Sequence, residues 1–225
     1  MLNPLISLLY PNLCVGCNGA LLAAETYFCT TCIQGLPETN FHLLPDNQLE
    51  KTFWGRIPLE RAFAFLTFRK QGIVQHILHE LKYGNKPELG VVVGRMYGSK
   101  LRDAGVQFDA IIAIPLHPKK LKLRGYNQSD CFAQGLSESL NCAHLKDVVV
   151  RKKATETQTR KGRFDRWLNV GEVFEVAHPE FIQQKKVLLV DDVITTGATI
   201  EGCAHPILAH TKHLSVASIA CVVHQ

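Results

Sequence analysis

The chain has 225 residues, of which 46% are hydrophobic and 20% charged, and its formal net charge is +5. A chain of this size buries enough apolar surface to fold without disulfide bonds, which favours one main globular domain with a small additional module. No apolar run reaches the roughly 20 residues of a membrane-spanning helix, so we expect no membrane span. The first 13 residues contain no Lys or Arg and no small-residue cleavage site, so we expect a cytoplasmic protein without a secretory signal.

Four of the eight cysteines form a regular array near the start of the sequence. Cys14, Cys17, Cys29 and Cys32 follow the pattern C-x2-C-x11-C-x2-C, in which each C-x2-C pair brings two thiolates to one tight turn. Two such turns complete a tetrahedral site, so the spacing predicts a structural Zn²⁺ in a zinc-ribbon module over residues 1–36. Two disulfide bonds are the alternative, which the expected intracellular location disfavours.

Residues 37–104 show three successive sequence patterns. Residues 37–60 contain three prolines and no clear hydrophobic period, so we expect a packed connector. Residues 61–68 alternate phenylalanine with small residues, a pattern typical of a strand. A helical period begins at Gly72 and predicts one helix that ends near Gly84, and a second helix follows over residues 88–104.

Alternating strands and helices fill the remainder of the chain and predict a mostly parallel α/β sheet. Two continuous apolar runs, residues 110–114 and 186–190, are typical of strands buried on both faces. The other expected elements, in chain order, are a loop over 115–125, a helix over 127–140, a short strand over 148–150, a turn over 191–199, a helix through about residue 210 and a strand over 214–223. Because parallel sheets carry function at the carboxyl ends of their strands, we expect the site after residues 114 and 190.

Positive charge is concentrated in two segments. Residues 115–125 carry four basic residues and no acidic residue, and residues 151–166 carry seven basic and two acidic residues. Such segments favour an anionic ligand such as phosphate, pyrophosphate or nucleic acid, although two solvated loops have the same composition. The candidates in the second segment for nucleic-acid contacts or a mobile lid are Lys152, Lys153, Arg160, Lys161, Arg163 and Arg166.

The most informative stretch covers residues 187–199. Four apolar residues are followed by Asp191 and Asp192, and a short hydroxyl-rich loop then opens a helix. Backbone amides at a helix N-terminus favour a phosphate dianion, and the two carboxylates are placed to accept hydrogen bonds from sugar hydroxyls. This pattern predicts a cradle for a ribose 5-phosphate made by Asp191, Asp192, Thr195, Thr196, Gly197, Ala198 and Thr199.

The same stretch resembles the 5-phosphoribosyl-1-pyrophosphate (PRPP) signature of type I phosphoribosyltransferases. Over nearly the whole chain, further motifs are similar to those of the ComF family and occur in the same order. These motifs are the four-cysteine ribbon, the helix end Leu81-Lys82-Tyr83, the segment 114–128 and the pattern that runs from Thr157 to Phe174. The resemblance implies a phosphoribosyltransferase-like domain over residues 61–225, with residues 37–60 as a connector or hood.

The resemblance also implies roles for particular residues. The loop after the first core strand would cradle pyrophosphate, and Arg124 is the strongest candidate because a guanidinium grips phosphate oxygens bidentately. The further PRPP-binding candidates in this loop are Pro115, Lys119 and Lys120. Asp191, Asp192 and Arg124 would be the catalytic residues, and Mg²⁺ bound with PRPP would help to neutralise the leaving pyrophosphate. Residues 151–166 would form the mobile lid, with a solvated strand end as the alternative for residues 151–153.

Three functions are compatible with these features. The first is a Mg²⁺-dependent phosphoribosyltransferase whose acceptor the sequence does not reveal. The second is a non-catalytic factor that handles single-stranded DNA with its basic loops and zinc ribbon, because the ComF resemblance implies DNA uptake in natural transformation with competence proteins as partners. The third is a regulator that senses PRPP. The intact diacid and hydroxyl loop favours PRPP binding but does not separate binding from turnover.

Overall fold

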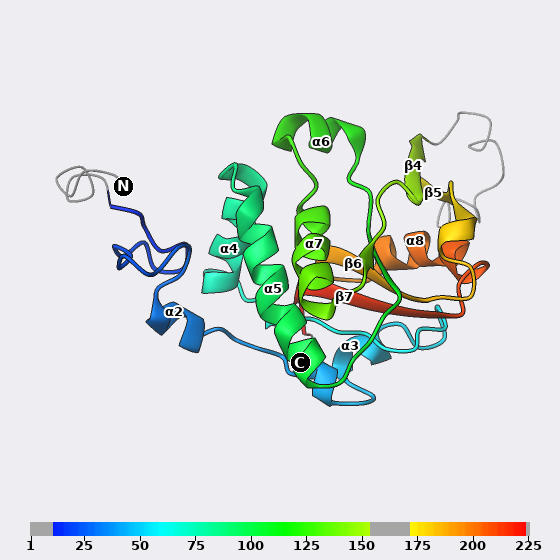
Figure 1. Cartoon of the computed structure of the whole chain (residues 1–225), viewed down its shortest axis with the longest axis horizontal. Coiled ribbons are helices and arrows are strands. Elements are labelled where there is room, and N and C mark those ends of the chain that lie inside the picture. Colours follow the sequence, from blue (N-terminus) through cyan, green and yellow to red (C-terminus); the bar gives the residue numbers. More distant parts are fainter. Residues whose placement is uncertain (1–10, 154–171, 224–225) are drawn as a thin grey trace.

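The computed structural model describes residues 11–153 and 172–223 and is built around a parallel β-sheet (Figure 1). Its five strands have the order β1-β7-β6-β2-β3, and every neighbouring pair runs parallel. The strands are β1 (Leu66–Thr67), β2 (Ala110–Ala113), β3 (Ala143–His144), β6 (Lys186–Ile194) and β7 (His213–Cys221). This sheet and the helices around it confirm the predicted mostly parallel α/β class.

Helices cover both faces of the sheet. Helices α4, α5 and α7 contribute to the core cluster on one face, and α8 to the cluster on the other. The helices that the structure describes are α2 (Thr30–Gln34), α3 (Gln48–Lys51), α4 (Ile73–Tyr83), α5 (Pro87–Asp103), α6 (Pro118–Arg124), α7 (Gln128–Leu140) and α8 (Ala198–Leu208), with 3-10 turns at Phe41–Leu43 and Pro179–Phe181. Side chains alternate along β6, so that Leu188 and Val190 join a core cluster with α4, α5 and α7, while Val187 and Leu189 join a second cluster with α8. Among the described residues, no helix combines the length and apolarity needed to cross a bilayer.

Helices α5 and α7 cross at unusually short range because glycines line the contact. A Cβ atom on Gly94 of α5 would lie 2.3 Å from the carbonyl oxygen of Phe132, and one on Gly135 of α7 would lie 2.1 Å from that of Val91. Both distances are far below van der Waals contact, so only glycine allows the two backbones to approach this closely. Helix α7 packs against β2 and β6. It begins beside their carboxyl ends, because Asn127 donates to the Ile114 carbonyl oxygen after β2 and Ser129 donates to Asp191 in β6.

Two expected elements near the site are corrected. Residues 115–125, expected as a loop, contain helix α6, which has local start and stop signals: Pro118 is at its first position, His117 caps it, and Gly125 ends it in a left-handed conformation. The expected turn over 191–199 is shorter, because β6 continues to Ile194 and Asp191 pairs with β7. Both aspartates are therefore strand residues.

Other boundaries differ because they depend on distant partners. The expected strand over 61–68 is regular only over β1, with an isolated bridge from Ala62 to Val216. The expected strand over 148–150 extends through β4 (Val149–Lys153), which pairs antiparallel with β5 (Glu172–Val176) in a separate hairpin. The helix expected through residue 210 ends at Leu208. The short edge strand β3 and strand β5 had not been expected.

Candidate functional site

Two carboxylates lie at the carboxyl end of β6, where the sheet order predicts a site. Asp191 accepts a hydrogen bond from the Ser129 hydroxyl at the start of α7, with 3.1 Å between the oxygens. Asp192 forms an ion pair with Lys82 in the last turn of α4, with 3.0 Å from Nζ to Oδ2. Strand β6 thus presents two adjacent acids to two different helices.

The pKa of Asp191 is raised from 3.8 to about 7. Burial is the main cause, and the negative charge of Asp192 adds to it, whereas hydrogen bonds from the Asp192 amide and Ser129 act in the opposite direction. A carboxyl group that titrates near neutral pH exchanges a proton readily under ordinary conditions. Such shifts are frequent at functional sites.

A cavity of about 250 Å³ opens beside the two carboxylates. Six of the sequence candidates line it: Pro115, Lys120, Arg124, Asp191, Asp192 and Thr199. Further polar residues that line it are Lys82, Asn127, Gln128, Ser129 and Arg151. Cationic and acidic side chains therefore share one small cavity, which suits a ligand with both anionic groups and hydroxyls.

Arg124 has an unusual environment at this cavity. Its Nη1 donates a hydrogen bond of 2.8 Å to the Gln128 side chain, and its guanidinium lies 5.7 Å from the centre of the Tyr83 ring. Its Nε is buried and, among the residues that the structure describes, has no hydrogen-bond partner. Because Gln128 accepts the only hydrogen bond that this guanidinium donates among the described residues, Arg124 has donor capacity left for an anionic ligand in the cavity.

The other sequence candidates for PRPP binding lie around the turn before α8 and on α6. Gly197 is the N-cap residue of α8 and has a φ of 78°. Because glycine has no side chain, the N-cap position makes no side-chain hydrogen bond to the helix. Thr195 and Thr196 are exposed in this turn, Ala198 begins α8, and Lys119 is exposed on α6. Unlike Thr199, these residues do not line the 250 Å³ cavity among its described walls. Of these residues, Thr195, Thr196, Gly197 and Ala198 lie at the N-terminus of α8.

The second basic segment is described only in part. Arg151 lines the cavity, donates to the Pro115 carbonyl oxygen at 3.2 Å and lies 5.3 Å from the centre of the Phe174 ring. Lys152 is exposed and forms an ion pair with Glu175 across the hairpin of β4 and β5. Lys153 ends β4. The remaining lid candidates, Arg160, Lys161, Arg163 and Arg166, lie outside the described residues.

Sequence reasoning missed Lys82 and Ser129 as site residues. Lys82 belongs to the motif Leu81-Lys82-Tyr83, but its spacing does not indicate that the end of α4 lies against β6. Tyr126, which follows the end of α6, supplies a second link to this end of α4, because its hydroxyl donates to the Leu81 carbonyl oxygen at 2.6 Å. Both contacts join segments that are far apart in the sequence.

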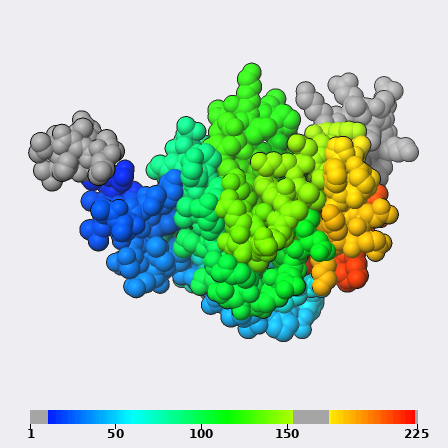
Figure 2. Space-filling view, in the orientation of Figure 1, coloured from blue at the N-terminus to red at the C-terminus, as the bar shows by residue number. Residues whose placement is uncertain are grey.

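The four predicted ligand cysteines converge in the N-terminal module, which lies beside α4 at one end of the molecule (Figure 2). All four Sγ atoms lie within 4.8 Å of one another, and the Sγ atoms of Cys17 and Cys29 are 3.8 Å apart. Four thiolates about 2.3 Å from a central Zn²⁺ are separated by about 3.8 Å. The cluster therefore has the chemistry and spacing to bind a metal such as zinc.

Backbone amides support the same conclusion at Cys14. The amides of Gly16 and Cys29 donate to its Sγ at 3.4 and 3.2 Å. Burial raises the pKa of this thiol, but hydrogen bonds, chiefly from backbone amides, more than compensate, and the pKa is lowered to about 6. A thiolate stabilised in this way is a ready metal ligand.

The module is joined to α4 by direct contacts. A Cβ atom on Gly16 would lie 2.6 Å from Cδ1 of Ile73, and the carbonyl oxygen of Gly16 lies 3.2 Å from Nδ1 of His76. Val15 and Phe28 belong to the same core cluster as α4. Helix α4 therefore touches the cysteine module with its first turns and the carboxylates with its last turn.

Comparison with known proteins gives close relatives in sequence. The chain is 30% identical to the DNA utilization protein YhgH of Escherichia coli K12 over 88% of this chain and 84% of that protein. It is also 30% identical to competence protein F of Haemophilus influenzae over 83% of this chain and 86% of that protein. No protein-family model matches the chain.

Solved structures give partial matches. A glutamine PRPP amidotransferase of Bacillus subtilis is 15% identical over 61% of this chain and 30% of that chain, with a TM-score of 0.41. A protein from Neisseria gonorrhoeae with bound ppGpp is 24% identical over 57% of this chain and 65% of that chain, with a TM-score of 0.38. The identity to competence protein F and to the DNA utilization proteins extends over more than four fifths of each chain, and the chain belongs to their family, the ComF family.

Proposed function

We propose that this protein binds PRPP in the cavity beside Asp191 and Asp192 and acts in the uptake or use of DNA. The observation that carries the proposal is the sharing of one cavity by these carboxylates and the side chain of Arg124, at the carboxyl end of a central parallel strand. The buried Nε of Arg124 has no hydrogen-bond partner in the part of the chain that the structure describes. The N-terminus of α8 follows directly and supplies amides for a phosphate group. The names of the relatives, DNA utilization protein and competence protein F, support the process.

The side chains suit the different parts of PRPP. Asp191 and Asp192 accept hydrogen bonds from the ribose hydroxyls, and the turn before α8 binds the 5-phosphate. Lys120, Arg124 and Arg151 neutralise the pyrophosphate, whose departure leaves positive charge on the sugar. Mg²⁺ bound with PRPP would add further positive charge at the leaving group. The acceptor is left unnamed, because the cavity walls contain no pattern specific for one.

Calorimetry with PRPP and Mg²⁺ tests this proposal. At about pH 8, above the pKa of Asp191, Asp191→Asn and Asp192→Asn should each weaken PRPP binding at least about 10-fold. Neutral amides lose the charge-assisted hydrogen bonds to the ribose, each about 1.5–3 kcal/mol. Asp103→Asn, on an exposed residue at the end of α5, is the control and should bind as the wild type does. Equal PRPP affinity in all four proteins would exclude the site. Release of pyrophosphate with an added acceptor would identify an enzyme, and tight binding without release a sensor.

Single-stranded DNA is a second candidate ligand, favoured by α6. No residue of this helix is buried, and its Lys119 and Lys122 are exposed beside the cavity. Lysines on such a projecting helix suit contacts with a phosphate backbone. Replacing both by Ala should lower the salt slope of single-strand binding by about 0.7 for each lost phosphate contact. A slope equal to that of the wild type would exclude α6 as the contact.

We also infer the division of the chain and its resident metal. Residues 1–36 form a zinc ribbon that binds one structural Zn²⁺ through its four cysteines, because all four positions are filled by thiolates. Residues 37–60 form a connector, and residues 61–225 form the phosphoribosyltransferase-like domain. Support for this division comes from the separate cysteine cluster and the continuous sheet.

A further inference from the structure

A phenylalanine from the connector supports the turn before α8. A Cβ atom on Gly197 would lie 2.6 Å from Cε1 of Phe53, a side chain that is 1% exposed. The aromatic ring therefore lies directly against the glycine backbone. Because Gly197 also has a positive φ, no other residue fits its conformation and its surroundings. The ring forms one fixed wall of the 195–197 turn.

An arginine three residues later binds the same turn. Nη1 of Arg56 donates to the Thr196 carbonyl oxygen at 2.8 Å and to the Thr52 carbonyl oxygen at 3.1 Å. Its Nε donates to Oε2 of Glu201 at 3.1 Å, and the two side chains form an ion pair. One guanidinium thus joins the turn, the first turn of α8 and the end of α3.

These contacts have two consequences for an anion at α8. The C=O and N–H groups of a trans peptide point in opposite directions, so holding the Thr196 carbonyl toward Arg56 directs the Gly197 amide away from Arg56. Glu201 is the acidic residue in the first turn of α8, where its charge would repel a bound phosphate. Arg56 neutralises this carboxylate.

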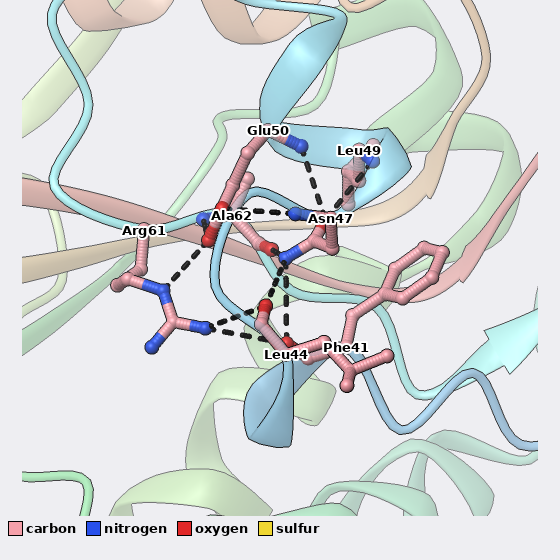
Figure 3. Close-up of polar contacts among 7 residues, drawn as sticks. All are labelled: Phe41, Leu44, Asn47, Leu49, Glu50, Arg61 and Ala62. Atoms are coloured by element: carbon pink, nitrogen blue, oxygen red, sulfur yellow. Dashed lines mark hydrogen bonds and ion pairs between the residues drawn. The ribbon is translucent and has the colours of Figure 1, made fainter.

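The connector that carries both residues is itself firmly anchored (Figure 3). The Asn47 side chain accepts hydrogen bonds from the amides of Leu49 and Glu50, and the Glu50 side chain accepts one from the Asn47 amide, which completes a capping box at α3. Asn47 Nδ2 donates to the Ala62 carbonyl oxygen at 3.1 Å, and Arg61 Nε donates to Glu50 at 2.6 Å. Since Ala62 bridges to β7, this network ties α3 to the sheet.

We infer that Arg56 and Phe53 are positioning residues for the 5-phosphate end of the site, which no sequence pattern assigned to the connector. They hold the 195–197 turn in its anion-binding shape, and Arg56 cancels the repulsion from Glu201. This inference rests on the proposed binding of PRPP. It separates the site into a 5-phosphate end that depends on the connector and a pyrophosphate end, near Lys120 and Arg124, that does not.

Binding of three ligands to the full chain tests this separation: ribose 5-phosphate, pyrophosphate and PRPP. Arg56→Ala should weaken ribose 5-phosphate and PRPP about 10-fold and change pyrophosphate less than twofold. Arg56→Ala with Glu201→Gln should recover part of the loss, because the uncompensated carboxylate is removed. Glu201→Gln alone should tighten ribose 5-phosphate about 2- to 5-fold, the size of a charge effect at a helix N-terminus.

A matched control is the ion pair of Arg95 with Glu138, which joins α5 to α7 away from the turn. Arg95→Ala, alone and with Glu138→Gln, should leave all three affinities unchanged. Thermal unfolding of every variant verifies its folding, and Glu201→Gln supplies the test if Arg56→Ala does not fold.

The outcomes separate the two proposals. Wild-type affinity for ribose 5-phosphate in Arg56→Ala, or an equal loss for pyrophosphate, would overturn the positioning role while PRPP binding stands. An unchanged affinity in Glu201→Gln would overturn the electrostatic part of the role. A wild-type protein that binds none of the three ligands would overturn PRPP binding itself, and the positioning role with it.

Discussion

The cysteine module and the sheet domain are stabilised in different ways. Within residues 11–36 the buried residues are Cys14, Val15, Phe28 and Leu36, and α2 buries none of its side chains. The sheet domain has a continuous hydrophobic cluster on each face, with β6 and β7 buried between them. The domain is thus stabilised by burial, whereas we expect the module to depend on a metal bound by its four cysteines. The difference predicts that each region responds to a different perturbation.

Loss of one metal ligand should have the largest effect, and only in the module. Cys29→Ser removes one of four thiolates, and because metal binding supplies about 10–16 kcal/mol in such sites, residues 11–36 should unfold. Hydrogen exchange and metal content measured on the full chain should then show a loss of both amide protection and zinc in the module, with the sheet still protected. Cys142→Ser, a cysteine outside the cluster, is the control. Retained zinc in Cys29→Ser would mean that four-thiolate ligation is wrong.

A methyl group at the crossing of α5 and α7 should produce the next largest effect, now in the domain. Gly94→Ala places a Cβ 2.3 Å from a backbone oxygen that cannot move freely, so the free energy of unfolding should fall by about 3 kcal/mol. Urea unfolding measures the change.

The matched control for this change is another helical glycine. A Cβ on Gly202 of α8 would meet Phe174 at an ordinary 3.8 Å, and Gly202→Ala should therefore be neutral or stabilise the protein by up to about 1 kcal/mol. If Gly94→Ala is as stable as Gly202→Ala, the close approach of the two backbones is wrong. Neither variant should change the metal content of the module.

The carboxyl group of Asp191 should produce a smaller effect that depends on pH. Its pKa is about 7 in the folded protein and 3.8 ordinarily, so between these values the folded state binds more protons than the unfolded chain. The stabilisation is complete below about pH 4 and is lost as the pH rises through 7, at no more than about 1.4 kcal/mol per pH unit.

Urea unfolding at several pH values between 5 and 8 measures this slope. Asp191→Asn cannot titrate and should flatten it, whereas Asp103→Asn should leave it unchanged. If the slope persists in Asp191→Asn, another group titrates in this range. The raised pKa of Asp191, and the burial that causes it, would then be wrong.

Local sequence patterns correctly predicted a helix, the cysteine cluster and a buried strand. Helix α7 begins at Gln128 after an Asn cap and ends at Leu140, within one residue of expectation. The cysteine spacing predicted a cluster, and the apolar run before Asp191 predicted a central strand. In each case the signal, whether cap, spacing or run, lies within the element itself.

Contacts between distant segments could not be predicted from local sequence patterns. The pairing of β1 with β7, the ion pair of Lys82 with Asp192 and the hydrogen bond from Arg56 to Thr196 join residues between 110 and 154 positions apart in the sequence. Helix α5 does show glycines at every fourth position, yet the sequence does not say which helix they meet. The type of a residue restricts which residues it can contact, but it does not identify the one that it contacts in the fold.

The position of β7 affects the order in which the molecule can be assembled. This last strand of the described chain lies inside the sheet, between β1 and β6. During synthesis from the N-terminus, the connector and β1 emerge well before β7, so β1 has no neighbouring strand in the sheet until β7 leaves the ribosome. The phenylalanine-rich stretch over residues 61–68 must therefore remain without its partner in the sheet until β7 has been synthesised.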